Sequence, residues 1–214
     1  MNKLNITPLS AEQTPDIIQQ CRRALAGAAR EACQGQLTAG TVGVISMRLP
    51  IAGLFLITPA GNSFEDIRNR DTCLVDSAGN LQEESTGRQL PSETKFHLNS
   101  YMVRTDIHAI AHLHPSHTSA YALRGEVFDL VTERARSEIK EVLRVQCREC
   151  ISRFCGLCSC RTDIRTSYAG VNVLLLKEDG VVILGTSLED MLKRANLVEK
   201  TAQESLINNS SLHT

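Results

Sequence analysis

Two histidines with strand spacing are the residues whose types and separation point first to chemistry. His112 and His114 stand in the run Ala-His-Leu-His-Pro. Side chains at positions i and i+2 of a strand point to the same face, so we expect both imidazoles on one side of a sheet. Paired imidazoles suit a divalent transition metal. The alternative interpretation is a pair of ordinary hydrogen-bonded strand residues.

A carboxylate nineteen residues before His112 offers a general base or a further metal ligand. Glu93 falls in the first turn of a helix predicted from Ser92, as N-cap, to about residue 104. We expect burial to raise the pKa of Glu93 towards neutrality, which suits proton abstraction next to a carbonyl group. The alternative is a carboxylate that only interacts with the helix dipole. His97, one turn further on, is expected to be structural.

Five of the eight cysteines crowd into fourteen residues, in two Cys-x-x-Cys pairs with a fifth thiol behind them. A zinc site would use four of the thiolates, although the spacer is shorter than in most zinc fingers. Part of the spacing matches plant-type ferredoxins, so an iron–sulfur cluster competes with zinc, and unmetallated thiols are the third possibility. Disulfides are disfavoured in the cytoplasm. The cysteines are Cys147, Cys150, Cys155, Cys158 and Cys160.

Composition narrows the class of protein. The chain has 214 residues, 42% of them hydrophobic, which can form one domain with a substantial core. Its formal net charge of −1 gives no general attraction to nucleic acid or to a membrane. The first residues carry no apolar run of signal-peptide length, and nowhere do 18 apolar residues follow one another. We expect a soluble cytoplasmic protein with a single domain over residues 1–214.

The elements that must position these residues alternate between helix and strand. The pattern predicts a mostly antiparallel sheet with helices on both faces, a three-layer α/β/α fold. Strands are predicted at 41–47, 54–58, 72–76, 107–114, 171–176 and 181–184, the last two as a hairpin. Helices are predicted at 14–33, 92–104, 116–123, 133–143 and 187–206.

Three stretches, in order, resemble the class II aldolase/adducin family. The first is Gly43-Val-Ile-Ser46-Met-Arg48 with Ile57-Thr-Pro-Ala-Gly61, the second joins Ser92-Glu93 to the two histidines, and the third is the hairpin 174–185. The family contains sugar-phosphate aldolases, epimerases, dehydratases and decarboxylases. The resemblance covers about residues 12 to 206 and implies the same α/β/α fold, a homotetramer, and a site near a subunit interface. A Cys-rich insertion at about 145–166 is atypical of it.

The resemblance also implies roles for the site. Family members bind zinc with three histidines, and the third comes from the hairpin, where this chain has Asp179. With His112 and His114, Asp179 would give two imidazoles and one carboxylate, a set that zinc accepts and that is typical of non-haem Fe(II). Ordinary turn chemistry is the alternative for Asp179, and Glu178 beside it is a second candidate for the third ligand. By resemblance, Glu93 moves the proton while the metal polarises the substrate oxygens.

A substrate pocket follows from the same resemblance, but with two departures. The phosphate-binding Asn and the first Ser of the family pattern fall on Val44 and Pro91, whose side chains donate no hydrogen bond. These departures argue against a sugar phosphate and favour a different small hydroxy-carbonyl compound. The residues expected to line the pocket are Thr41, Gly43, Ser46, Thr58, Gly61 and Ser92.

Three functions remain open from the sequence. The first is a metal-dependent lyase, with zinc or Fe(II) at the histidines, that catalyses aldol cleavage, dehydration or decarboxylation. The second is a redox enzyme that uses non-haem iron or an iron–sulfur cluster. The third is a non-catalytic, adducin-like assembly or metal-binding module, against which the joint retention of Glu93, His112 and His114 argues. The expected partners are a small-molecule substrate and further copies of this chain, not nucleic acid or membrane.

Overall fold

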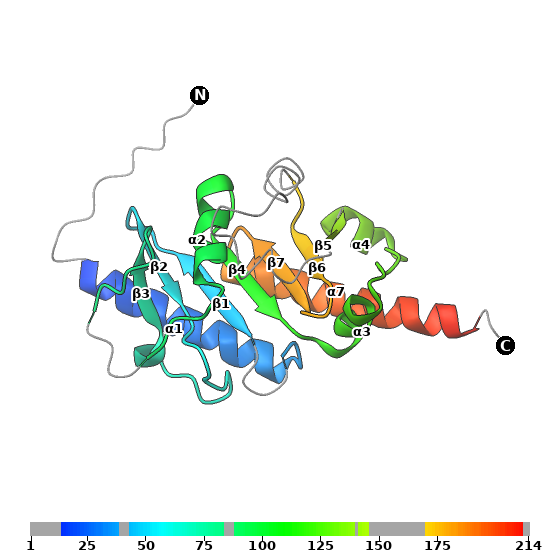
Figure 1. Cartoon of the computed structure of the whole chain (residues 1–214), viewed down its shortest axis with the longest axis horizontal. Helices are drawn as coiled ribbons and strands as arrows, with labels where there is room; N and C mark the ends of the chain where they lie inside the picture. Colours follow the sequence, from blue (N-terminus) through cyan, green and yellow to red (C-terminus); the bar gives the residue numbers. More distant parts are fainter. Residues whose placement is uncertain (1–13, 39–42, 84–87, 140, 146–169, 212–214) are drawn as a thin grey trace, which may run out of the picture.

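A seven-stranded sheet forms the centre of the computed structural model, which describes residues 14–38, 43–83, 88–139, 141–145 and 170–211 (Figure 1). The strand order is β3-β2-β1-β4-β7-β6-β5, and every pairing except β5 with β6 is antiparallel. The strands are β1 (Val44–Arg48), β2 (Leu54–Ile57), β3 (Cys73–Asp76), β4 (Ala109–Leu113), β5 (Val142–Val145), β6 (Val173–Leu176) and β7 (Val181–Gly185).

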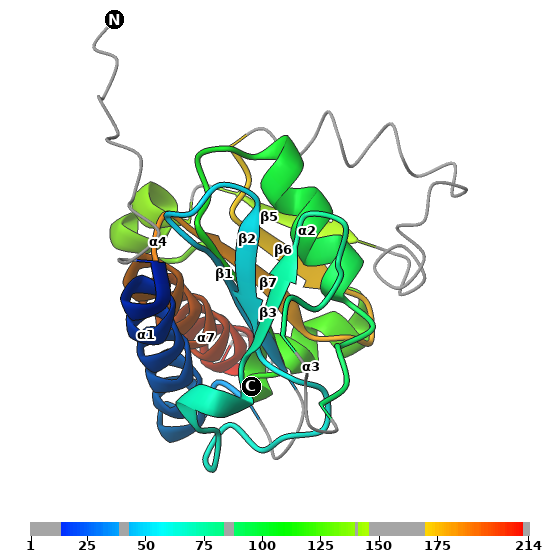
Figure 2. The same cartoon turned by 90° about the vertical axis from the view of Figure 1, so that its left-hand side faces the viewer.

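Helices cover both faces of this sheet, as the sequence predicts (Figure 2). The long helices α1 (Thr14–Gln34) and α7 (Leu188–Ser211) pack on one face, with α3 (Ser116–Arg124) and α4 (Glu133–Glu138) in the same hydrophobic cluster. Helix α2 (Thr94–Val103) packs on the other face. A short 3-10 helix, Asn69–Asp71, precedes β3. The two faces bury separate hydrophobic clusters, so the fold has three layers.

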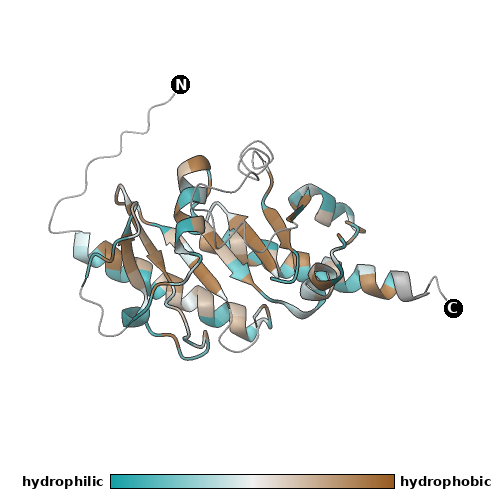
Figure 3. Cartoon of the chain, in the orientation of Figure 1, coloured by the Kyte–Doolittle hydropathy of each residue, from teal (hydrophilic) through white to brown (hydrophobic). Residues whose placement is uncertain are grey.

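Strand β4 lies in the middle of the sheet and is buried on both faces. Ala109, Ala111 and Leu113 belong to the cluster under α1 and α7, whereas Ile110 belongs to the cluster under α2. Strand side chains alternate between faces, so His112 lies on the α2 face with Ile110. Figure 3 shows the strands as the most hydrophobic part of the chain.

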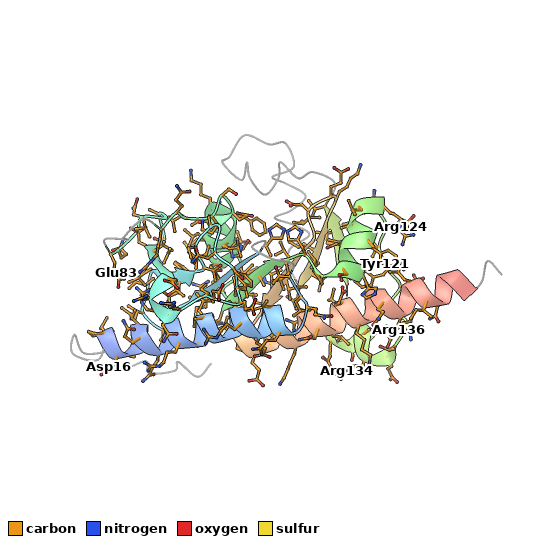
Figure 4. All side chains as sticks on the ribbon, turned by 90° about the horizontal axis from the view of Figure 1, so that it is seen from below. Asp16, Glu83, Tyr121, Arg124, Arg134 and Arg136 are labelled. Carbon is orange, nitrogen blue, oxygen red and sulfur yellow. The ribbon has the colours of Figure 1, made fainter. Side chains whose placement is uncertain are left out.

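Helices α1 and α7 lie along the same face of the sheet, α1 over one end of it and α7 over the other (Figure 4). Helix α3 is fixed to α7 through Tyr121, whose hydroxyl donates to Ser205 Oγ at 2.8 Å. Of the helices that the structure describes, none combines the length and the apolar character needed to cross a membrane.

Three predicted helix boundaries were wrong. The helix predicted over 133–143 ends at Glu138, and Val142–Val145 form the edge strand β5 instead. Valines at both ends of this run favour extended backbone, and parallel pairing with β6 supplies the hydrogen bonds. Ser92 is not the N-cap of α2, because that position belongs to Glu93. The last helix also continues five residues beyond its predicted end.

Candidate metal and active site

The two histidines and the hairpin aspartate meet at the end of β4. His112 is in the strand, His114 follows directly after it, and Asp179 belongs to the turn between β6 and β7. One ligand atom from each of the three residues lies within 4.8 Å of the others, and the imidazole centroids are 4.9 Å apart. The structure therefore brings together three residues that lie up to 67 positions apart in the chain.

This donor set fits a divalent metal ion. Bonds of roughly 2.0–2.2 Å from nitrogen and oxygen to zinc place neighbouring ligand atoms roughly 3–4 Å apart. Binding one ion would therefore need side-chain rotations that also free a ring nitrogen of His112 from its present contacts with the Asp179 carbonyl and Glu93. His112 is buried, whereas His114 and Asp179 are partly exposed. The arrangement combines a buried anchor with an open side from which a substrate can approach.

The turn that carries Asp179 is fastened to its surroundings by its own backbone. The N–H of Asp179 donates to the Leu176 carbonyl at 3.1 Å, and the N–H of Glu178 donates to the Ala122 carbonyl of α3 at 3.3 Å. Gly180 has a φ of 73°, and a Cβ there would lie 2.3 Å from the Leu113 carbonyl oxygen. Only glycine allows the turn to approach the end of β4 this closely.

Glu93 reaches the site from the start of α2. Its Oε1 is 3.5 Å from Nδ1 of His112, and its Oε2 accepts a hydrogen bond from Ser92 Oγ at 2.8 Å. The Glu93 side chain makes no capping hydrogen bond to the helix backbone. Its carboxylate is therefore directed at the histidine and not at the helix terminus.

The electrostatics of Glu93 differ from the prediction. The hydrogen bond with His112 lowers the pKa of Glu93 to about 2, and this effect together with the Ser92 bond outweighs burial. Burial lowers the pKa of His112, but the Glu93 carboxylate and the Asp179 carbonyl raise it above its ordinary value. That carbonyl oxygen is 2.5 Å from Nε2 of His112. The predicted rise in the pKa of Glu93 was wrong, because it considered burial without the imidazole.

His97 lies inside the protein, in keeping with its expected structural role. Its Nδ1 is 2.7 Å from Ser46 Oγ, which is 2.9 Å from the Tyr101 hydroxyl, and all three side chains are buried. Burial lowers the pKa of His97 to about 3. The hydroxyl of Ser46, predicted from the sequence to face the substrate, has these internal partners instead.

The other predicted pocket residues lie in different settings. Thr58 is buried, and its hydroxyl accepts the backbone N–H of Ile45 at 3.0 Å. Gly43 has a positive φ and packs against the His112 carbonyl, where a Cβ would lie 3.3 Å from the oxygen. Ser92 and Gly61 are exposed. Contact of these residues with a substrate stays a prediction.

Some predicted residues lie outside the part of the chain that the structure describes. They are Thr41 and the five cysteines Cys147, Cys150, Cys155, Cys158 and Cys160. The insertion at about 145–166 and its metal chemistry therefore stay predictions. Val44 and Pro91, which replace the hydrogen-bonding residues of the family pattern, are both buried. Val44 pairs with His112 across β1 and β4.

One residue that supports the site had no signal in the sequence. Glu199 of α7 accepts hydrogen bonds from the backbone N–H groups of His117 and Thr118, at 2.8 and 2.9 Å. It also contacts both of their side chains, at 2.7 Å each. These groups form the first turn of α3, whose N-cap Pro115 makes no side-chain cap. Glu199 thus fixes the turn that follows His114, from about 80 residues away in the chain.

Comparisons with known proteins place this geometry in context. Residues 23–206 match the family model of the class II aldolase and adducin N-terminal domain. The L-fuculose phosphate aldolase of Methanococcus vannielii is 26% identical over 166 residues, which cover 77% of this chain and 83% of that protein. The 5-methylthioribulose-1-phosphate/5-deoxyribulose-1-phosphate aldolase of Rhodospirillum rubrum is 27% identical over 183 residues, covering 86% and 79%.

A solved structure has the same fold. The L-fuculose 1-phosphate aldolase from Glaciozyma antarctica PI12 superposes with a TM-score of 0.77 at 19% identity, over 95% of this chain and 78% of the other. At this identity the likeness concerns the fold alone. It covers the sheet and the helices that position the candidate site.

Proposed function

The chain belongs to the class II aldolase and adducin family, and we propose that it is a metal-dependent lyase acting next to the carbonyl of a small hydroxy-carbonyl compound. The observation that carries this proposal is the convergence of His112, His114 and Asp179 beside Glu93. Three ligand atoms and one carboxylate base are the parts that this chemistry needs. The relatives that match over most of their length are aldolases by name.

Each residue has a distinct role in the proposal. His112, His114 and Asp179 would hold zinc or Fe(II), which when bound would supply a Lewis acid for the carbonyl oxygen. While it faces His112, the carboxylate of Glu93 is ionised, because the hydrogen bond with that imidazole lowers its pKa to about 2. A turn away from His112 would remove this effect and make the carboxylate a stronger base. It accepts a proton from the substrate and returns it after the bond breaks. The Ser92 hydroxyl fixes one carboxylate oxygen and leaves the other for this transfer.

The proposed substrate class differs from that of the named relatives. Val44 and Pro91 are buried and have no side-chain donor for a phosphate. We therefore assign a hydroxy-carbonyl compound whose recognition does not depend on a phosphate at these positions. Aldol cleavage, dehydration and decarboxylation share the required step, in which electrons move towards a carbon next to the carbonyl. A cytoplasmic homo-oligomer, a tetramer by resemblance, belongs to the same proposal.

The test combines metal analysis with paired probes. Protein purified without oxygen is assayed for zinc, iron and acid-labile sulfide per chain. L-Fuculose and L-fuculose 1-phosphate, which differ only by the phosphate, are then offered as substrates, and aldehyde release is measured. We expect cleavage that a chelator abolishes and one metal restores, with no advantage for the phosphate. Absence of both metal and chelator-sensitive turnover would overturn the lyase and favour the assembly module.

Redox chemistry at iron is the second candidate, because Asp179 gives the donor set one carboxylate beside two imidazoles. Its discriminator is turnover that requires both Fe(II) and oxygen. The sulfide measurement addresses the cysteines separately. Acid-labile sulfide with extra iron would assign an iron–sulfur cluster to the cysteine insertion, whereas more than one zinc per chain would assign a zinc site to it. If neither is found, the cysteines are unmetallated thiols.

A further inference from the structure

A chain of three buried polar groups lies on the α2 face of the sheet, next to Glu93 and His112. It consists of Tyr101, Ser46 and His97, and we name it the Tyr101–Ser46–His97 relay. Ser46 pairs with Ile110 in the register of β1 and β4, two residues before His112 on the same face. The relay therefore connects α2, which carries the proposed base, to the strands beside the proposed metal ligand.

Either hydroxyl of the Tyr101–Ser46 pair could be the donor by geometry. The phenol is the more acidic of the two, so we assign Tyr101 as the donor to Ser46 Oγ at 2.9 Å. Ser46 has a single hydroxyl hydrogen, which it then donates to Nδ1 of His97 at 2.7 Å. A neutral imidazole that accepts at Nδ1 carries its hydrogen on Nε2. With these directions His97 is the Nε2–H tautomer.

That Nε2–H group is buried and has no hydrogen-bond partner among the residues that the structure describes. A buried donor without an acceptor is destabilising, so it calls for a functional explanation. Glu93 lies one helical turn before His97, and its carbonyl accepts the His97 N–H at 3.1 Å. Side chains four residues apart on a helix are neighbours, and the charge of Glu93 acts on the His97 ring.

We propose that His97 is a positioning residue that donates from Nε2 to the Glu93 carboxylate when this carboxylate turns from His112 towards the substrate. This inference rests on the proposed function. The donor is suited to the task because an imidazole that stays neutral at working pH orients the base without protonating it. Ser92 on one side and His97 on the other would then hold the carboxylate in one orientation.

The first experiment reads the tautomer directly. The protein is labelled with ¹⁵N on histidine, and the ring nitrogens of His97 are assigned by NMR with His97→Gln as reference. We expect a neutral ring with hydrogen on Nε2 in the wild type, and a mixture of tautomers in Ser46→Ala. A hydrogen on Nδ1 would overturn the proposed relay. This readout needs no substrate and therefore no assumption about the reaction.

The second experiment compares kinetics with the probe that the metal-loaded protein cleaves. His97→Phe keeps an aromatic ring without a donor, His97→Gln restores an N–H, and the exposed His108→Phe serves as control. We expect kcat to fall about 100-fold in His97→Phe with KM within a factor of about three, and to recover partly in His97→Gln. Thermal unfolding shows whether each variant is folded.

The outcomes separate the inference from the function on which it rests. Wild-type kcat in His97→Phe, beside an inactive Glu93→Gln, would overturn the positioning role and leave the lyase intact. Full activity in Glu93→Gln would overturn the lyase and, with it, the role of His97 in orienting a base. Should His97→Phe fail to fold, the tautomer and the His97→Gln kinetics still decide the question.

Discussion

Nδ1 of His112 lies 3.5 Å from Oε1 of Glu93, so a proposed metal ligand and a proposed base face one another from different elements. His112 comes from β4 and Glu93 from the start of α2. Phe96 and Tyr101 of α2 share a hydrophobic cluster with Ile110 of β4, and this packing fixes the approach. The separation of ligand and base is thus determined by the core of one face of the sheet.

Replacing Glu93 by Gln tests the base. The amide keeps the size of the side chain but does not accept a proton at neutral pH, so we expect kcat to fall by about 10²- to 10⁴-fold. The metal content is expected to stay that of the wild type, because the three ligands remain. The measurement is steady-state turnover together with metal analysis, with the exposed Glu65→Gln as control. Full turnover in Glu93→Gln would exclude the proposed role.

Replacing Asp179 by Asn tests the third ligand. The change removes the anionic oxygen from the donor set. Losing a residue that only hydrogen-bonds to a metal ligand typically lowers metal affinity about 10- to 100-fold, so we expect the loss of a ligand itself to lower it by more than about 100-fold. Competition with a chelating dye gives the affinity. Glu178→Gln, in the same turn but exposed, is the matched control. Equal affinities for both variants would remove Asp179 from the ligand set.

The buried His97 predicts a pH dependence of stability. Its pKa is about 3 in the folded protein and about 6.5 in an unfolded chain. Below pH 6.5 the unfolded chain binds a proton that the folded protein does not, so the free energy of unfolding falls as pH falls, by up to about 1.4 kcal/mol per pH unit.

Urea unfolding from pH 7.5 to 4.5 measures this effect. The His97→Gln protein lacks the titrating ring, so its deficit against the wild type is expected to shrink as the pH is lowered. His108→Gln removes an exposed histidine and serves as the control. A deficit that stays constant over this range would show that His97 binds its proton over the same pH range in the folded and unfolded states, contrary to its buried, neutral assignment.

The parts of the fold and site that the sequence predicted correctly depend on short-range patterns in the chain. The alternation of His112 and His114 on β4 needs only the two-residue period of a strand. The pairing of β6 and β7 follows from a turn sequence that ends in Gly180. The edge strand β5 escaped prediction because its four residues depend on pairing with β6 for their hydrogen bonds. Short runs of this kind have no decisive local signal.

Relationships across the fold account for what the sequence did not reveal. The low pKa of Glu93 depends on His112, which reaches it only after α2 packs on the sheet. The sequence predicts that Ser46 lines the substrate pocket, but in the structure its hydroxyl has hydrogen-bond contacts with Tyr101 and His97. In both cases the environment of a side chain comes from a distant element, which spacing along the chain does not encode.

The carboxylate of Glu199 provides the last prediction. It is mostly buried and caps α3 through the backbone of His117 and Thr118, directly after the turn that carries His114. Glu199→Ala leaves these N–H groups and the Thr118 hydroxyl without their acceptor, so we expect a loss of about 1–3 kcal/mol in the free energy of unfolding. Urea unfolding with an unchanged m-value measures it.

The control for Glu199 is Glu189→Gln on the same helix, where the carboxylate is 77% exposed and pairs with Lys193. An exposed pair of this kind contributes little to the free energy of unfolding, because solvent screens it. Because the cap also fixes the turn behind His114, Glu199→Ala is expected to weaken metal binding, while Glu189→Gln is not. Lower stability with unchanged metal affinity would show that Glu199 only stabilises the fold. Loss of both stability and metal affinity would show that the cap also helps to hold His114, which lies just before it in the chain.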